Sequence, residues 1–436
     1  MAKQSVSSEA VQQAGSAGGP AVARSVEETG LTVTFLADLI LKQILFVGEF
    51  TQTQVAASTG LSLPVVEQAV DLLRRERLVE VKGMIETQKF TFRFAITDRG
   101  RKRGDDLMRI CRYVGPAPVL LEDYRRQTAA QSIRHMRVTQ ELVNAAFADL
   151  VIDVSLRDRL GPAIAAGQTI LLYGPTGNGK TTIAETVGAM LPDIIHVPHA
   201  LLVGGEVVTV FDPASHRRVE AEEKLDGRWV AIRRPVVKVG GEFTLRLLDI
   251  GFNPVAGFYE APLQMKGNNG LFIIDDFGRQ AVEPQSILNR WIISLDRRID
   301  YLSLQNGLKF DIPFDQLVIF STNSAPRLLL DDASLRRIRY KIPVDRPSAA
   351  NFEQIFQQAC RERHIPYDAA AFDHLVGAYY RKLGIAPDAC HARDILNHLL
   401  ERAAYLRETP TLSPIAIDAA WESCFIPPTT PPLPDA

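Results

Sequence analysis

The chain has 436 residues, of which 46% are hydrophobic and 23% are charged, and this composition is typical of a soluble globular protein with about three domains. The formal net charge of −2 excludes a bulk attraction to nucleic acid or to an anionic membrane, so any such binding would need a local basic patch.

Membrane insertion and disulfide bonding are not expected. No apolar run reaches the roughly 18 residues that a membrane-spanning helix needs, and the start of the chain lacks the apolar segment of a secretory signal. The four cysteines are scattered without the paired spacing of a disulfide framework or a zinc site. We therefore predict a cytoplasmic protein.

Both ends of the chain are predicted to be tails. Residues 1–28 are small and polar, which favours disorder. Residues 426–436 are rich in proline, and we interpret them as a frayed end. A segment of this composition can alternatively bind an aromatic groove as an extended helix.

Residues 29–115 show the order helix, helix, helix and then strands. Thr51 and Gln54 occupy the positions of a capping box, and Gly60 follows the helix that they begin. The next helix starts at Ser62 and buries one apolar face, and the segments "LVEV" and "FTFRFAIT" alternate as paired strands. This order resembles the winged-helix domains of bacterial regulators.

The rest of the chain divides into three segments. Residues 116–150 are predicted to form a helical linker. Residues 151–345 alternate strands with helices, which indicates an α/β fold with a parallel sheet. Residues 346–425 have helical apolar spacing and are predicted to form a helical domain.

The most specific motif is "TILLYGPTGNGKTTIAETVGAML", residues 169–191. A strand, a glycine-rich turn and a helix follow one another here, which is the context that a P-loop requires. Glycines let successive backbone N–H groups face phosphate oxygens, Lys180 reaches the β and γ phosphates, and the hydroxyl of Thr181 can bind Mg²⁺. The predicted ATP-binding residues are Gly174, Pro175, Thr176, Gly177, Asn178, Gly179, Lys180, Thr181 and Thr182.

A second strand, "LFIIDD", ends in two aspartates. A P-loop site needs an acid at the end of such a strand to hold Mg²⁺. We assign Asp275 to the metal, together with Thr181, and we assign Asp276 the role of the base that orients the attacking water.

These elements, in this order, resemble the AAA+ ATPases over roughly residues 150–410, which implies a P-loop AAA+ core with residues 346–425 as its lid. "LVIFSTN" is similar to their sensor 1 strand and implies that Asn323 lies near the γ-phosphate. "LDDASLRRIRYKIPVDRP" resembles the segment that ends in the arginine finger, with Arg337 as the first candidate and Arg336 as the second. "CHARDILNHLL" resembles the lid helix that carries the sensor 2 arginine, here Arg393.

The sequence departs from the family at Asp276, where most members have glutamate. The shorter side chain predicts slow turnover, because a shift of about 1 Å can cost about 10²-fold in rate. A protein that binds ATP and scarcely hydrolyses it is the alternative.

Asn306–Gly307 between "YLSL" and "LKFDI" predicts a two-residue hairpin before sensor 1. This hairpin is similar to that of the MoxR-type chaperones and their neighbouring AAA+ branches. Residues 193–270 form a long insert in which "VVTVFDP", "RWVAIRRPVVKV" and "EFTLRLL" suggest extra strands. Within it, Phe258 and Tyr259 are candidates either for client contact or, with more weight, for core packing.

The resemblance implies an ATP hydrolase that assembles into a ring, a hexamer in this family, and remodels a protein client. The rival is a DNA-binding regulator, because residues 31–115 hold 13 Lys or Arg against 10 Asp or Glu, a net of +3. Its basic edge would comprise Arg74, Arg75, Arg77, Arg101, Lys102 and Arg103, and a solvated charged face accounts for them equally well. A small-molecule kinase is a third hypothesis, which the lid and the arginine finger disfavour.

Overall fold

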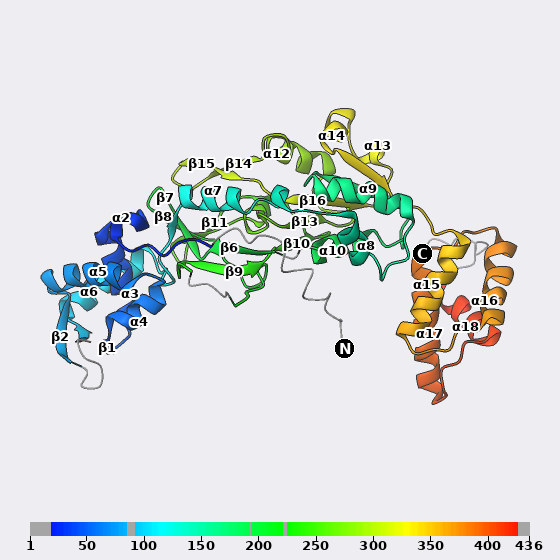
Figure 1. Cartoon of the computed structure of the whole chain (residues 1–436), viewed down its shortest axis with the longest axis horizontal. Helices are drawn as coiled ribbons and strands as arrows, with labels where there is room; N and C mark the ends of the chain where they lie inside the picture. The colour runs from blue at the N-terminus through cyan, green and yellow to red at the C-terminus, as the bar shows by residue number, and fades with distance from the viewer. Residues whose placement is uncertain (1–18, 85–91, 192, 221–224, 426–436) are drawn as a thin grey trace, which may run out of the picture.

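The computed structural model describes residues 19–84, 92–191, 193–220 and 225–425. Its parts follow one another along the long axis, with the N-terminal domain at one end and the helical lid at the other (Figure 1). The prediction for residues 426–436 and most of that for the first tail lie outside these ranges. In the part of the chain that the structure describes, no helix is long and apolar enough to cross a membrane.

The N-terminal domain contains the predicted three helices and paired strands. Its elements are α2 (Val26–Thr29), α3 (Val33–Ile44), β1 (Glu49–Phe50), α4 (Gln52–Thr59), α5 (Leu63–Arg75), β2 (Val79–Met84), β3 (Phe92–Ile96) and α6 (Asp98–Ile110). The capping box of Thr51 and Gln54 is present, and Gly60 ends α4 at φ +68°. The strands form an antiparallel sheet in the order β1–β3–β2.

The predicted tail of residues 1–28 is too long, because its last part is structured. Ala23 and Val26 are buried, and the carbonyl of Pro20 accepts a hydrogen bond from the backbone N–H of Asp226 at 3.2 Å. The segment therefore packs against a region that lies far along the chain. Local composition does not report such a contact, which is why small polar residues suggested disorder.

The predicted helical linker over residues 116–150 is mostly helical, but it starts with a strand that was not predicted. The segment contains α7 (Leu121–Ala130), η1 (Ile133–His135) and α8 (Gln140–Ala146), but it begins with the strand β4 (Val119–Leu120). This strand pairs in parallel with β7 (Ala200–Val203) and places the fully buried Val119 in a sheet. A two-residue strand whose partner is distant leaves no periodic pattern in the sequence.

The insert of residues 193–270 builds a sheet domain beside the core. It contains β6 (Ile194–Pro198), β7 (Ala200–Val203), β8 (Glu206–Thr209), β9 (Trp229–Arg233), η2 (Leu245–Leu248), β11 (Gly251–Asn253), β12 (Phe258–Glu260) and α11 (Leu263–Lys266). One sheet has the order β11–β12–β8–β7–β4, and β6 pairs with β9. The segment "EFTLRLL" forms the 3-10 helix η2 rather than a strand, because the buried Phe243 and Leu248 anchor a turn.

The core is an α/β fold around a five-stranded parallel sheet, as predicted. Its strands run in the order β10 (Val236–Val239), β13 (Leu271–Ile274), β16 (Leu317–Thr322), β5 (Ile170–Tyr173) and β17 (Tyr340–Pro343). The helices of the core are α9 (Val154–Ala165), α10 (Lys180–Ala189), α12 (Pro284–Arg297), α13 (Pro326–Leu329) and α14 (Asp332–Arg337). Strands β13 and β16 are fully buried, because separate apolar clusters cover the two faces of the sheet.

The predicted hairpin before β16 is formed by β14 (Ile299–Ser303) and β15 (Lys309–Pro313). Its connection has three residues rather than two, because the N–H of Leu304 donates to the carbonyl of Leu308 at 2.9 Å, and Gly307 adopts φ +85°. Apolar side chains of this hairpin share a buried cluster with β7, β8 and β9. The hairpin is therefore held against the sheet domain.

The lid is helical, with α15 (Ala349–Glu362), α16 (Ala369–Leu375), the π-helical segment η3 (Val376–Arg381), α17 (Ala389–Leu406) and α18 (Pro414–Cys424). Phe352 and Phe356 of α15 pack with Leu396 of α17 and Trp421 of α18 in its own core. The lid is thus a separate apolar unit, which stands apart from the sheet in Figure 1.

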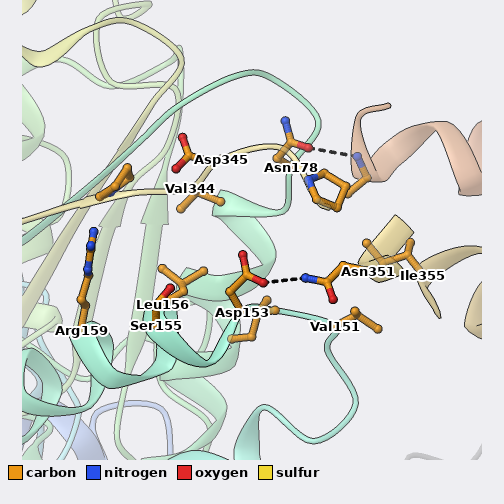
Figure 2. Close-up of a pocket in the computed structure, with 14 residues that line it drawn as sticks. Val151, Asp153, Ser155, Leu156, Arg159, Asn178, Val344, Asp345, Asn351 and Ile355 are labelled. Carbon is orange, nitrogen blue, oxygen red and sulfur yellow. Dashed lines mark hydrogen bonds between the residues drawn. The ribbon is translucent and has the colours of Figure 1, made fainter. Parts of the chain in front are cut away.

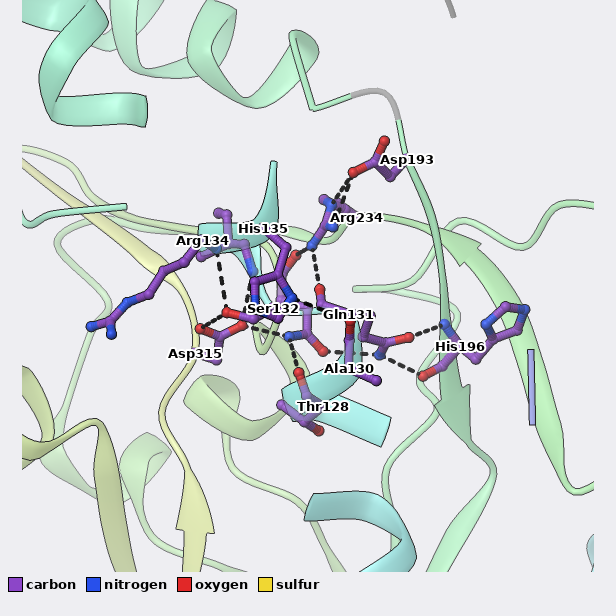
Figure 3. Close-up of polar contacts among 12 residues, drawn as sticks. Thr128, Ala130, Gln131, Ser132, Arg134, His135, Asp193, His196, Arg234 and Asp315 are labelled. Carbon is purple, nitrogen blue, oxygen red and sulfur yellow. Dashed lines mark hydrogen bonds and ion pairs between the residues drawn. The ribbon is translucent and has the colours of Figure 1, made fainter. Parts of the chain in front are cut away.

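A buried polar network joins the sheet domain to the core, as Figure 3 shows. Gln131, at the end of α7, binds the backbone N–H and carbonyl of His196 at 2.9 Å each and the side chain of Asn269 at 2.9 Å. Arg234 donates to the carbonyls of Gln131 and Asn269, and Ser132 donates to Asp315. Arg234, Asn269 and Asp315 precede β10, β13 and β16, so the network lies at the amino ends of the core strands.

Candidate functional site

The P-loop lies between β5 and α10, as the motif predicted. Gly174, Gly177 and Gly179 have φ values of +147°, +78° and +81°, a backbone region that favours glycine, and α10 begins at Lys180. The ammonium of Lys180 is buried and donates to the carbonyls of Gly174 at 3.0 Å and Pro175 at 2.7 Å. Burial lowers the pKa of Lys180, while the nearby Asp276, Asp275 and Asp388 act in the opposite direction.

The two residues assigned to the metal lie together. Asp275 directly follows β13, and the hydroxyl of Thr181 lies 2.9 and 3.0 Å from its two carboxylate oxygens. One hydroxyl and one carboxylate are oxygen donors of the kind that Mg²⁺ takes beside a nucleotide, so the residues fit this ion. Among the described residues there is no cluster of three or more His, Cys, Asp or Glu that could hold a metal. A metal here would therefore need further oxygens from phosphate and water.

Asp276 is held in an uncommon backbone conformation beside the predicted sensor. Its φ is +48°, and its carboxylate accepts a hydrogen bond from the side-chain amide of Asn323 at 2.9 Å. The parallel pairing of β13 with β16 brings these two strand ends to one edge of the sheet. The side chain of Gln280 braces this turn by donating to the carbonyls of Asp275 at 2.8 Å and Asp276 at 3.2 Å.

Lys180, Thr181, Asp276 and Asn323 line one cavity of about 400 Å³. Arg393 of α17, the predicted sensor 2 arginine, also lines it. Arg279 and Cys390 also line it and were not predicted. Arg279 follows the predicted catalytic residue Asp276 by only three residues, and this closeness in sequence could have identified it as a site residue. The full lining is Thr176, Gly177, Asn178, Gly179, Lys180, Thr181, Thr182, Asp276, Arg279, Ser321, Asn323, Ala389, Cys390 and Arg393.

The two arginine-finger candidates lie outside this cavity. Arg337 donates to the carboxylate of Asp296 at 3.3 Å and to the carbonyl of Ala333 at 2.7 Å. Arg336 lines a separate cavity with Arg327 and other residues. Neither arginine therefore belongs to the phosphate site of its own chain.

The lid helix α17 begins directly on the P-loop, a contact that the sequence did not predict. The side-chain amide of Asn178 donates to Asp388 at 2.8 Å and accepts a hydrogen bond from the N–H of Ala389 at 3.0 Å. The N–H of Cys390 donates to the carbonyl of Gly177 at 2.9 Å. Burial raises the pKa of the Cys390 thiol to about 11, with Asp394 and Asp388 adding to the shift.

A second cavity, of about 130 Å³, adjoins the first and shares Asn178 and Ala389 with it (Figure 2). Its lining comes from the core and the lid, with Ile355 of α15 as an apolar wall. The amide of Asn351 donates to the carboxylate of Asp153 at 2.6 Å across one side. Apolar side chains such as Val151 and Ile355 therefore share its wall with the polar groups of Asp153 and Asn351.

Comparisons with known proteins add little beyond the fold. Residues 348–423, the lid, match a family described as a domain of unknown function (DUF8689). No curated protein matches the chain in sequence.

Among solved structures, NtrX from Brucella abortus in complex with ATP is 13% identical with a TM-score of 0.38, over 60% of this chain and 54% of that one. The Thermotoga maritima RuvB Holliday junction branch migration motor is 14% identical with a TM-score of 0.35, over 67% of this chain and 72% of that one. The chain spans about half the length of NtrX. At these values neither similarity carries information on activity or partners.

Proposed function

We propose that the chain binds ATP with Mg²⁺ and hydrolyses it. The observation that carries this proposal is that Lys180, Thr181, Asp276 and Asn323 line a single cavity at one edge of the parallel sheet. Asp275 lies directly behind Thr181, whose hydroxyl contacts its carboxylate. The P-loop glycines and the first turn of α10 offer backbone N–H groups to phosphate. The second cavity, which adjoins the first, would receive the adenine base of ATP.

Each residue then has a separate task. Lys180 would leave the carbonyls of the P-loop and bind the β and γ phosphates, and Thr181 with Asp275 would hold Mg²⁺, which supplies charge neutralisation at the phosphates. Asp276 would orient the attacking water and accept its proton, with Asn323 fixing the carboxylate. Arg393 would add positive charge from the lid.

We further propose that the site is completed in an oligomer, a hexameric ring as the AAA+ resemblance implies. Arg337, with Arg336 as the second candidate, lies outside its own phosphate cavity and would serve the site of a neighbouring subunit. An arginine supplied at the γ-phosphate speeds transfer by roughly 10³ to 10⁵. Hydrolysis would thereby depend on assembly.

The work that we propose is the remodelling of a protein client, with the N-terminal domain acting as a winged helix that selects it. The β2–β3 hairpin of that domain exposes Met84 and Phe92. By contrast, Tyr259 is buried, which agrees with its role in core packing. The β14–β15 hairpin packs one face on the sheet domain and leaves Tyr301 and Leu308 exposed.

The test is phosphate release from ATP by the purified chain over a range of protein concentrations. We expect the rate per subunit to climb with concentration, and Lys180→Ala to abolish it. Arg337→Ala should bind ATP normally yet fail to hydrolyse it, and mixing it with the Lys180→Ala variant should restore part of the rate. ATP binding without phosphate release at any concentration would leave only a nucleotide-sensing role.

An ATP-controlled DNA regulator is the alternative, since Arg74 and Arg75 end α5. Against it, Arg74 is paired with Asp71 at 3.2 Å and Arg103 with Asp38 at 3.2 Å. Duplex binding that weakens with salt and is lost in the double variant Arg74→Ala, Arg75→Ala would favour this function over client remodelling.

A further inference from the structure

A lysine lies beside the carboxylate assigned to Mg²⁺. Lys238 is on β10, the strand next to β13, and its ammonium lies 3.4 Å from a carboxylate oxygen of Asp275. The same ammonium lies 2.8 Å from a carboxylate oxygen of Glu185 on α10. Lys238 thus bridges the P-loop helix and the acid of the proposed metal site.

The fold determines that the side chain of Lys238 points toward α10. Along β10, Val237 and Val239 are buried in the cluster on one face of the sheet, so Lys238 and Val236 point to the other face, where α10 lies. A Cβ on Gly188 would lie 2.8 Å from Val236, which shows how closely the helix approaches the strand. Thr181, Glu185 and Gly188 are spaced by four and three residues, so they share the face of α10 that meets the strands.

Both carboxylate oxygens of Asp275 are engaged by these neighbours. Thr181 lies within 3.0 Å of each, and Lys238 approaches the second of them. An ammonium and Mg²⁺ at the same carboxylate repel each other, so each weakens the binding of the other to that single negative charge.

We propose that Lys238 is a resident counter-ion of Asp275 that competes with Mg²⁺, and that Glu185 is the carboxylate to which it withdraws when the metal binds. Lys238 lines no part of the nucleotide cavity, so its effect falls on the metal rather than on ATP itself. Its function is to limit Mg²⁺ binding to the nucleotide-loaded state. This inference rests on the proposed function.

The experiment measures binding of a non-hydrolysable ATP analogue to the full chain by calorimetry, first with EDTA and then over a series of Mg²⁺ concentrations. The pair is partly exposed, with 41% of the lysine side chain accessible, and solvent therefore screens it. We expect Lys238→Met to lower the half-saturating Mg²⁺ concentration about two- to fivefold. Affinity in EDTA should stay within about twofold, since the nucleotide does not touch this residue.

We expect Glu185→Gln to change the half-saturating Mg²⁺ concentration in the opposite direction. Without its second partner, Lys238 stays on Asp275, so the half-saturating Mg²⁺ concentration rises. The double variant should behave like Lys238→Met alone. Lys341→Met on β17 is the matched control, because this exposed lysine lies on the far edge strand of the same sheet.

The outcomes separate the two proposals. If the wild-type chain binds no analogue with or without Mg²⁺, the proposed function fails and this inference falls with it. If the analogue binds but neither variant moves the Mg²⁺ dependence, or both move it in the same direction, the counter-ion role of Lys238 is wrong while nucleotide binding stands.

Discussion

At the scale of single residues, the hydrogen bonds around Asp276 determine where its carboxylate lies in the candidate site. Asp276 and Asn323 lie at adjacent strand ends and are joined by a hydrogen bond of 2.9 Å. Gln280 holds the turn from the other side, which keeps the shorter aspartate in a single position. A preorganised carboxylate loses less rate than a mobile one, so the missing methylene need not abolish hydrolysis.

Replacing Asp276 by asparagine tests its role as base. The amide cannot accept the proton of water, so we expect phosphate release to fall by about 10² to 10⁴, the usual contribution of a general base. Affinity for ATP should change little, because the P-loop is untouched. Asn323→Ala serves as the comparison and should lower the rate less. Equal rates in the wild type and Asp276→Asn would remove Asp276 from the mechanism.

One buried imidazole, that of His216, and one half-buried imidazole, that of His199, predict acid sensitivity. Burial, helped by the charge of Arg218, lowers the pKa of His199 to about 4, and burial also lowers the pKa of His216. The folded state therefore favours the neutral rings, while the unfolded chain binds protons near pH 6.5. Stability is full above about pH 6.5 and is lost as the pH falls toward 4.

Thermal unfolding measured between pH 7 and 5 should show this loss directly. We expect His199→Asn to lose less stability over that range than the wild type does, even if it is less stable at pH 7. His135, which is exposed, provides the control substitution His135→Asn. Parallel pH profiles for the wild type and His199→Asn would show that His199 does not titrate in this way.

At the scale of elements, the P-loop is in direct contact with the first turn of the lid helix α17. A Cβ on Gly177 would lie 2.4 Å from the sulfur of Cys390, whereas a Cβ on Gly179 would meet nothing within 4 Å. Both glycines have positive φ. The two positions therefore separate backbone strain, which they share, from the contact with the lid, which only Gly177 makes.

Gly177→Ala should lose more stability than Gly179→Ala. Each variant suffers about 1–2 kcal/mol from the left-handed backbone, and Gly177→Ala must also displace the lid. We expect a lower unfolding midpoint and faster proteolysis between α16 and α17 only in Gly177→Ala. Adding Cys390→Ala should recover the extra loss. Equal behaviour of the two glycine variants would mean that the lid does not rest on the P-loop in solution.

At the scale of the whole molecule, the buried polar network of Figure 3 joins the sheet domain to the core, at the end of the parallel strands opposite the P-loop. The amide of Gln131 satisfies both backbone groups of His196 and the side chain of Asn269. Such a network stabilises only when every member is paired. It therefore fixes the position of the insert relative to the parallel sheet of the core.

Gln131→Leu should destabilise the chain by about 3 kcal/mol, because it leaves buried partners unpaired at roughly 1–3 kcal/mol each. Denaturant unfolding at equilibrium measures this change. Gln140→Leu on α8 is the matched control, since Gln140 is exposed and should change stability by less than about 0.5 kcal/mol. A loss equal to that of the control would show that water replaces the lost hydrogen bonds.

The sequence by itself determined the features that depend on neighbouring residues. The glycines and Lys180 of the P-loop, the two aspartates after an apolar strand, the capping box of Thr51 and the helices of the lid all follow from local backbone preference and side-chain periodicity. These signals extend over a few residues, so they can be recognised in the sequence without knowledge of the fold.

The tertiary structure decided which distant groups meet. It placed β4 in a sheet with β7, packed the β14–β15 hairpin against the insert, set Asn178 on the first turn of α17 and brought Lys238 to Asp275. None of these contacts has a period or a motif. They exist because strand order and the burial of apolar faces bring together side chains that the chain keeps far apart, and only the packed fold satisfies their hydrogen bonds and charges.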